Sequence, residues 1–391
     1  MKSQSKTATA LIVSSVICAA AAYLLRNRFP PFCIGFGYLF VALLYRSVHV
    51  KPARAYIYNL AFIFLALAIA EFWFRDDAFT VGGPTGTHYE GAYTAGGYFQ
   101  SDKELGGSLV PGRRTVSAVK KSNDGNLIYS ASYTIDEFGF RAMPHVPNAP
   151  DTVYFFGCSF TFGEGVNNAD TFAYRYSLLS GRRVRDFGVH GYGPHQMLRA
   201  LETDRPKRLG IPDPPALVIY VALSTHVYRT AGKASWDSHG PHYEIRNGKA
   251  EYLGPFSDQH ENWLRRILNR SFVISRLAQP WRHRADLERY VAIVKKSRDL
   301  VAQRYGVPFV VVLWDFYGKR EERRDATWIF TRLAREGVKV VRLSEAIPDL
   351  GEPRLYILHD GHPRPPLHEK VAQAIYDWSK QIDSGLTHTE R

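Results

Sequence analysis

A serine in a glycine-rich turn is the first group in this chain that could act as a nucleophile. Ser159 lies within the stretch GCSFTFGEG at 157–165, directly after the apolar run TVYFF at 152–156. A short apolar, β-branched and aromatic run predicts a buried parallel strand, and the glycines after it predict a strand-to-helix turn. Open α/β sheets place their sites at the carboxyl ends of such strands. We therefore expect Ser159 where a nucleophile would lie.

An acid and an imidazole lie two residues apart near the end of the chain. The stretch HDGHP at 359–363 contains Asp360 and His362, and a segment with helical periodicity follows from about Pro366. Serine catalysis needs a base that takes the hydroxyl proton and a carboxylate that fixes the tautomer of the base. Asp360 and His362 supply both groups, so the expected chemistry is acyl transfer through Ser159.

Other interpretations of the turn at 157–165 fit its residues less well. A phosphate-binding loop ends in a lysine, which this stretch lacks, and a nucleophile elbow has glycine where this chain has Thr161. Two alternatives stay open: a glycine-rich loop without chemistry, and Cys158 as the nucleophile in place of the serine.

The histidines do not predict a metal or a cofactor. His190 with His195, and His359 with His362, lack the i, i+4 spacing of a helical ligand pair, and no carboxylate cluster completes a set. We expect no metal site and no cofactor. His190 and His195 are interpreted as residues that line the cleft or cap the following helix.

Three motifs taken together resemble the SGNH hydrolase superfamily. They are Gly-x-Ser-x-Thr-x-Gly-x-Gly at 157–165, DFGVHGYG at 186–193 and Asp-Gly-His-Pro at 360–363. The resemblance covers roughly residues 136–380. It implies a three-layer α/β/α sandwich with a doubly wound, mostly parallel five-stranded sheet, and the activity of a membrane-anchored esterase or O-acyltransferase.

The resemblance also implies roles for individual residues. Ser159 would be the nucleophile, His362 the general base and Asp360 its orienting carboxylate, with backbone N–H groups of Ser159 and Gly191 in the oxyanion hole. Some members place the acid two residues before the base, as here, whereas many place it three before, where this chain has His359.

One oxyanion-hole donor of the superfamily is missing. The family has an asparagine after the third strand, and this chain has Ser-Thr-His at 224–226. Thr225 through its hydroxyl, or His226 through its ring, would have to replace it. Because losing one such donor costs about two to three orders of magnitude in turnover, an inactive envelope-binding module stays open as an alternative.

The elements expected around these residues alternate as in a doubly wound fold. The chain predicts strands at 152–156, 183–187, 217–223, 307–314 and 338–343, and helices near 168–180, 194–208, 285–305, 324–336 and 366–382. The α/β domain would span 151–383, with a tail at 384–391. An insertion at 230–284 contains a hairpin that turns at 247–248. It also contains a basic stretch at 261–276, for which three alternatives stay open: it shapes the cleft, it is a solvated helix, or it lies on a membrane surface.

Residues 1–75 are predicted to form a membrane region. Three apolar runs, at 7–25, 29–45 and 55–74, approach the roughly 20 residues that a bilayer needs. A cleaved signal peptide is the alternative for the first run. The basic residues favour a multi-pass protein of the inner membrane with its catalytic domain on the periplasmic side. Glu71 is interpreted as an end residue paired with Arg75.

Residues 76–150 are predicted to form a β-rich extension that packs on the catalytic domain. Alternating runs flank a turn at 123–125, and the short element at 136–141 is expected to pack against the sheet.

The chain carries a net charge of +13 at pH 7, yet its basic residues are spread and form no nucleic-acid motif. The expected partners are the membrane and an ester-bearing glycan of the cell envelope, with a lipid ester as the rival substrate; partners in envelope biosynthesis stay unknown.

Overall fold

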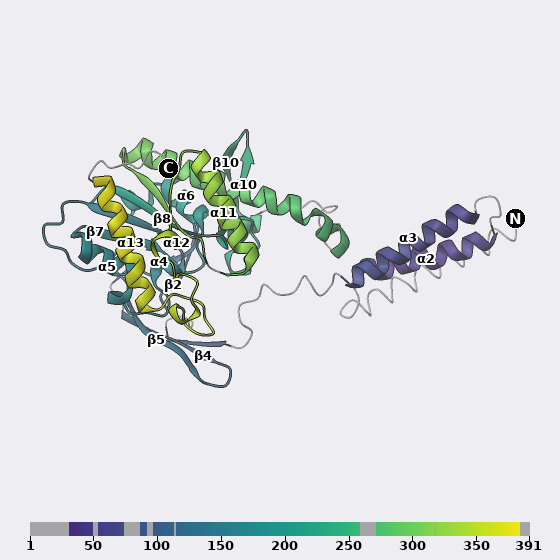
Figure 1. Cartoon of the computed structure of the whole chain (residues 1–391), viewed down its shortest axis with the longest axis horizontal. Helices are drawn as coiled ribbons and strands as arrows, with labels where there is room; N and C mark the ends of the chain where they lie inside the picture. The colour runs from purple at the N-terminus through teal and green to yellow at the C-terminus, as the bar shows by residue number, and fades with distance from the viewer. Residues whose placement is uncertain are drawn as a thin grey trace. The chain divides into compact units, whose positions relative to one another are not determined.

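The computed structural model divides the chain into two compact units, and each is described by itself. One contains Met1–Gly83 and His260–Arg284, and the other contains Pro84–Gln259 and Ala285–Arg391 (Figure 1). The residues that the structure describes are 31–49, 54–73, 87–91, 97–112, 115–258, 271–316 and 318–383.

The first unit contains two apolar helices, α2 (Pro31–His49) and α3 (Arg54–Trp73). They pack side by side through ring contacts such as that of Phe36 with Phe64, whose centroids lie 5.9 Å apart. Within the described residues, only Tyr56–Trp73 is long and apolar enough to cross a membrane, with a mean hydropathy of 1.7. The apolar part of α2 is shorter, and the expected span at 7–25 lies outside the described residues, so three spans are not confirmed.

Glu71 near the end of α3 has a different role from the one expected. It is fully buried, and it accepts hydrogen bonds from the Ser271 hydroxyl and, at 2.8 Å, from the backbone N–H of Phe272. These residues begin α10 (Phe272–Tyr305), so the carboxylate caps the first turn of that helix, where backbone N–H groups lack partners. The expected partner Arg75 lies outside the described residues.

The second unit is built on a five-stranded parallel sheet with strand order β12-β11-β8-β6-β7. Its strands are β6 (Thr152–Gly157), β7 (Arg183–Gly188), β8 (Leu217–Leu223), β11 (Phe309–Trp314) and β12 (Lys339–Arg342). Every residue of β6, β8 and β11 is buried, which explains why these strands are continuous apolar runs. All five expected strands are present.

Helices cover both faces of this sheet and complete a three-layer α/β/α arrangement. One face packs against α5 (Phe172–Ser180) and α13 (Pro365–Asp383). The other packs against α6 (Pro194–Glu202), the later part of α10, and α11 (Arg320–Arg335). The helix expected over 194–208 is interrupted, because Asp204 adopts a left-handed φ of 51° before the short α7 (Arg205–Arg208).

The expected β-rich extension belongs to the same unit as the sheet. Strands β1 (Thr87–Gly91), β4 (Thr115–Ser122) and β5 (Leu127–Thr134) form an antiparallel sheet, and β2 (Phe99–Asp102) pairs with β3 (Gly106–Leu109). Tyr98 and Tyr133 of this region pack with Phe162 and Val189 of the α/β domain. The insertion forms the expected hairpin from β9 (Pro241–Arg246) and β10 (Lys249–Pro255).

Candidate active site

Ser159 begins the short helix α4 (Ser159–Phe162), and Cys158 alone separates it from the end of β6. The turn between them is very tight, because a Cβ added at Gly157 would lie 1.9 Å from Thr161 Oγ1. Only glycine therefore lets the chain enter α4 in this way. The first N–H groups of a helix have no partner within it, so the Ser159 N–H is oriented by α4 and remains available to an oxyanion.

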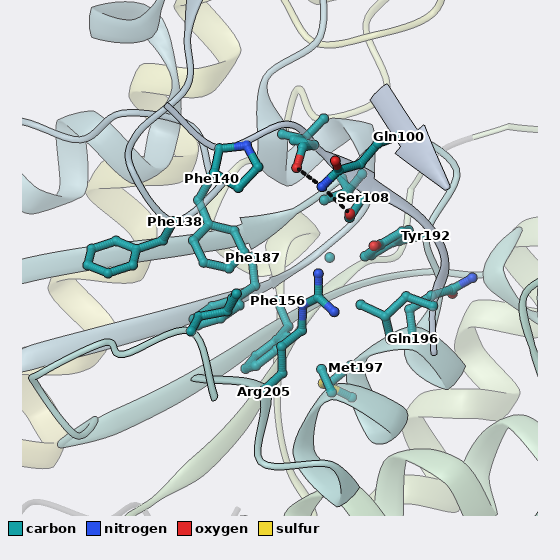
Figure 2. A pocket seen from close by; sticks show the side chains of 18 of the residues that line it. Gln100, Ser108, Phe138, Phe140, Phe156, Phe187, Tyr192, Gln196, Met197 and Arg205 are labelled. Atoms are coloured by element: carbon teal, nitrogen blue, oxygen red, sulfur yellow. Dashed lines mark hydrogen bonds between the residues drawn. The ribbon is translucent and has the colours of Figure 1, made fainter. Parts of the chain in front are cut away.

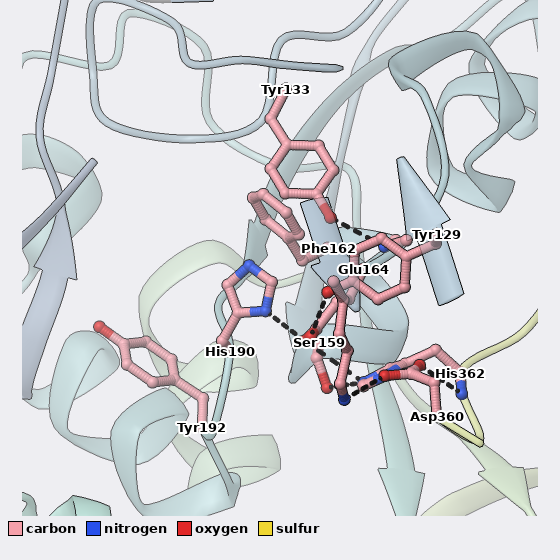
Figure 3. Close-up of polar contacts among 12 residues, drawn as sticks. Tyr129, Tyr133, Ser159, Phe162, Glu164, His190, Tyr192, Asp360 and His362 are labelled. Carbon is pink, nitrogen blue, oxygen red and sulfur yellow. Dashed lines mark hydrogen bonds and ion pairs between the residues drawn. The ribbon is translucent and has the colours of Figure 1, made fainter. Parts of the chain in front are cut away.

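The structure brings Ser159, His362 and Asp360 together although about two hundred residues separate the first two (Figure 3). His362 Nε2 lies 2.7 Å from Ser159 Oγ, and His362 Nδ1 lies 2.5 Å from Asp360 Oδ1. The same carboxylate oxygen accepts the backbone N–H of His362 at 3.1 Å. The base is thus held from both ring nitrogens in the order that serine acyl transfer requires.

The second oxygen of Asp360 binds a lysine from the β-rich extension. Lys120 Nζ on β4 lies 2.7 Å from Asp360 Oδ2, and the two side chains are only 4% and 0% exposed. Burial alone would raise the pKa of Asp360, but hydrogen bonds from His362 and Lys120 hold this pKa below its usual value. Burial would likewise lower the pKa of Lys120, and Asp360 raises it instead. Both groups are therefore charged.

A second buried carboxylate approaches His362 from the opposite side. Glu164 Oε2 lies 3.4 Å from His362 Nε2 and 2.6 Å from His190 Nδ1, and the Tyr129 hydroxyl donates to Glu164 Oε1 at 3.0 Å (Figure 3). His190 Nε2 in turn lies 2.6 Å from the Tyr98 hydroxyl. Burial opposes ionisation of Glu164, but the two histidines and the tyrosine hydrogen bond hold its pKa well below the usual range.

The same surroundings act on the pKa of His362. Burial alone would lower this pKa, but the carboxylates of Glu164 and Asp360 more than compensate and raise it above its usual value. The imidazole is therefore a stronger base than a histidine in water, and it stays protonated up to a higher pH.

A buried arginine fixes the loop that carries Glu164. Arg141 is fully buried and donates to the carbonyl oxygens of Phe162 at 2.9 Å, Gly163 at 2.8 Å and Val166 at 2.6 Å. The element at 136–141, which we expected only to pack against the sheet, therefore also positions the carboxylate beside the base.

Two of the expected oxyanion residues lie at the carboxyl edge of the sheet. Gly191 follows β7 with a left-handed φ of 77°, and a Cβ there would lie 2.7 Å from Trp236 Nε1, so the position favours glycine. Thr225 follows β8, the strand beside β6, and its side chain makes no capping hydrogen bond to α8 (His226–Thr230). Their roles in catalysis stay predictions.

His226 and His195, expected in the cleft, point into the interior instead. Both side chains are fully buried. His226 Nδ1 lies 2.6 Å from the Tyr220 hydroxyl, and burial lowers the pKa of His226 well below its usual value. His195 Nε2 lies 2.7 Å from Asp237 Oδ2. Since each ring is held by an interior partner, neither lines an open cleft.

Three side chains at the site have ligand types that metals use. Oxygen and nitrogen atoms of Glu164, Asp360 and His362 lie within 4.8 Å of one another. Each of them already has protein partners: Glu164 has His190 and Tyr129, and Asp360 has Lys120 and His362. A buried lysine on one carboxylate opposes a second cation there, so we assign these groups to a hydrogen-bond network.

A small apolar pocket lies near the site but does not contain its reacting groups (Figure 2). It has a cavity volume of about 60 Å³ and lies at the carboxyl ends of β6 and β7. Gly157 is part of its lining, whereas Ser159, Asp360 and His362 are not. The Arg205 side chain that enters it is paired with Asp102 at 2.7 Å.

The sequence contained weak signals for the residues that we did not predict. Glu164 stands between two glycines within the quoted serine motif, five residues after the nucleophile. Lys120 shares the inward-facing parity of Ala118 on β4, and both are buried. A lysine at a buried strand position needs a carboxylate partner, but no local pattern pointed to Asp360.

No protein-family model matches the sequence, and no curated protein sequence matches it. Several solved structures are similar. A lipolytic protein of the G-D-S-L family from Veillonella parvula shares 9% identity, covers 58% of this chain and 96% of its own, with a TM-score of 0.36. An acetyl xylan esterase from Butyrivibrio proteoclasticus shares 11% identity, and the match covers 77% of this chain and 84% of the esterase, with a TM-score of 0.39. A psychrotrophic esterase from Pseudoalteromonas shares 11% identity, and the match covers 60% of this chain and 99% of the esterase, with a TM-score of 0.34. At these low scores, the chemistry rests on the residues described above.

Proposed function

We propose that this protein is a serine ester hydrolase or O-acyltransferase of the SGNH type that works through an acyl-enzyme. The observation that carries the proposal is the pair of contacts at His362, 2.7 Å from Ser159 Oγ and 2.5 Å from Asp360 Oδ1. These distances lie within the range expected for a nucleophile, a base and an orienting acid.

The first half of the reaction transfers the acyl group to the enzyme. Nε2 of His362 takes the proton of Ser159 Oγ, and the oxygen attacks the ester carbonyl. Backbone N–H groups of Ser159 and Gly191, with the Thr225 hydroxyl as a third donor, stabilise the oxyanion. His362 then gives the proton to the leaving alcohol, and the acyl group stays on Ser159.

The second half transfers the acyl group to an acceptor hydroxyl. The acceptor gives its proton to His362 and attacks the acyl carbon, and Ser159 leaves with a proton from His362. With water the outcome is hydrolysis, and with a sugar hydroxyl it is O-acyl transfer. The atoms of the site are the same for both, because only binding of the acceptor and exclusion of water separate them.

We further propose a membrane location and an envelope substrate. The apolar helix α3 would serve as an anchor, and the basic residues near the expected spans favour a catalytic domain on the periplasmic side. Such a place favours O-acyl groups of cell-envelope glycans as substrates, with lipid esters as the rival. These statements rest on topology and on the resemblance of the motifs, which is an argument by analogy.

Covalent labelling of the full-length protein in detergent tests the proposed chemistry. We expect a fluorophosphonate probe to label the wild type and the surface control Ser130→Ala, and to leave Ser159→Ala unlabelled. Turnover of p-nitrophenyl acetate should fall by about five to six orders of magnitude in Ser159→Ala. A folded wild type that neither labels nor turns over ester would instead indicate the inactive envelope-binding module.

A further inference from the structure

The buried groups around His362 do not balance in charge when its ring is neutral. The charged groups that face His362 are Asp360, Glu164 and Lys120. His368 on α13 also interacts with His362, but burial lowers the pKa of His368 to about 3, so its ring is neutral. Lys120 and Asp360 form a closed ion pair at 2.7 Å, so their charges cancel. Among the described residues, Glu164 forms an ion pair with no lysine or arginine; its contacts are the rings of His362 and His190 and the Tyr129 hydroxyl. Counting the two carboxylates and Lys120, these groups carry a net charge of −1, which an imidazolium at His362 balances.

We propose that Glu164 is the counter-ion of protonated His362, and that Asp360, neutralised by Lys120, mainly fixes the orientation of the ring. Glu164 is a positioning residue in this proposal, because it acts on the base and not on the substrate. The inference rests on the proposed acyl-transfer function and names the group that stabilises its charged intermediate.

The position of Glu164 explains when this stabilisation acts. While His362 is neutral, the Nε2 lone pair accepts the Ser159 proton and also faces the Glu164 anion 3.4 Å away, which is unfavourable. After proton transfer, Nε2–H faces the same anion favourably. Once the serine oxygen is bonded to the acyl carbon, it is a poor hydrogen-bond acceptor. Glu164 Oε2 then remains as the acceptor for the Nε2 proton until that proton moves to the leaving alcohol.

The neighbours of Glu164 keep the carboxylate in this place. A carboxylate only accepts hydrogen bonds, so His190 donates from Nδ1, and its Nε2 forms a hydrogen bond with the Tyr98 hydroxyl at 2.6 Å. Tyr129 holds the other oxygen. These contacts hold Glu164 Oε2 between the two rings, 2.6 Å from His190 Nδ1 and 3.4 Å from His362 Nε2.

Opposite charge changes on the two sides of the ring give the sharpest test. The rate of fluorophosphonate labelling of the full-length protein is measured against pH, and its rising limb reports the deprotonation of the base. Glu164→Gln removes an anion that favours the imidazolium, so the limb should move to lower pH. Lys120→Met removes a cation that disfavours the imidazolium, so the limb should move to higher pH. A purely structural role for both residues would lower the rate without opposite shifts.

Titration of the ring itself separates this inference from the proposed function. In full-length protein with ¹⁵N-labelled histidine, the His362 signals are assigned by their loss in His362→Gln and followed against pH, which needs no catalysis. If the fluorophosphonate probe does not react with the wild type, the proposed function fails. The titration of His362 still tests whether Glu164 stabilises its protonated ring. An unchanged His362 titration in Glu164→Gln overturns the inference. Glu164→Asp, which withdraws the carboxylate while keeping its charge, should give a smaller shift in the same direction and serves if the glutamine variant does not fold.

Discussion

The two sides of His362 each present a buried carboxylate, yet the two carboxylates are held in opposite ways. Asp360 lies two residues from the histidine in the same loop, and a lysine from β4 cancels its charge. Glu164 comes from the loop after α4 and is held by Tyr129 and His190. In the proposed division of roles, Asp360 fixes the orientation of the His362 ring, and Glu164 supplies the negative charge that stabilises its protonated form.

The same comparison shows how the β-rich extension takes part in the site. Lys120 and Tyr129 lie on neighbouring strands of the extension, and each binds one of the two carboxylates. The extension therefore supplies a cation to one carboxylate and a hydrogen bond to the other, on either side of a histidine that belongs to the α/β domain. Packing on the sheet, which was its expected role, is only part of what it does.

Among substitutions of the two carboxylates and their partners, the largest effect is expected from Asp360→Asn. The asparagine amide would donate to His362 Nδ1 and stabilise the wrong tautomer, so kcat/KM should fall by about 10³ to 10⁴-fold at every pH. Glu164→Gln should keep far more activity at pH values above the rising part of its pH–rate profile, because it leaves the tautomer of His362 unchanged. Esterase assays on both variants, with the exposed Asp299→Asn as control, test this. Equal losses at high pH in the two variants would contradict the division of roles.

A smaller effect, on stability, is expected from Lys120→Met. The substitution leaves the buried Asp360 charge without its cation, which costs about 3–5 kcal/mol. Removing the charge as well, in Lys120→Met with Asp360→Asn, should recover part of this loss. Thermal unfolding of the two single variants and the double variant measures the coupling between them. Strict additivity would mean that the ion pair does not form.

A third buried carboxylate, away from His362, is expected to make stability depend on pH. Asp186 has no cation in an ion pair among the described residues; burial raises its pKa to about 8, although its Oδ1 accepts the Gly188 N–H at 2.8 Å. Its folded-state pKa lies above the unfolded value, so the folded protein binds more protons between about pH 4 and 8 and loses stability as pH rises there.

Asp186→Asn should therefore flatten the fall in melting temperature across that window and cost little below it. The asparagine oxygen can still accept the hydrogen bond from Gly188. Melting curves of the wild type and the variant at several pH values between 5 and 8 check this. The same pH slope in both proteins would show that Asp186 is ionised in the folded state.

The parts of the fold that the sequence predicted well depend on local patterns. The buried strands β6, β8 and β11 are uninterrupted apolar runs, and such runs are apolar because both faces of the sheet are covered. The length of an apolar run is less informative for the membrane region: among the described residues one helix is long and apolar enough to cross a membrane, and the expected span at 7–25 lies outside them. Helix interruption at Asp204 was also missed, because it depends on a single backbone conformation.

Local sequence motifs were enough to predict a serine at the end of a strand, and an acid and an imidazole together in one loop near the end of the chain. Each of these two features lies within a stretch of a few residues, so a local motif can indicate it. Three other features depend on how distant segments pack together. They are the contact of Lys120 with Asp360, the contact of Glu164 with His362, and the burial of His226. The first of these contacts joins residues 240 positions apart. Contacts of this kind form because a buried charge must find a partner, and the partner can come from anywhere in the chain.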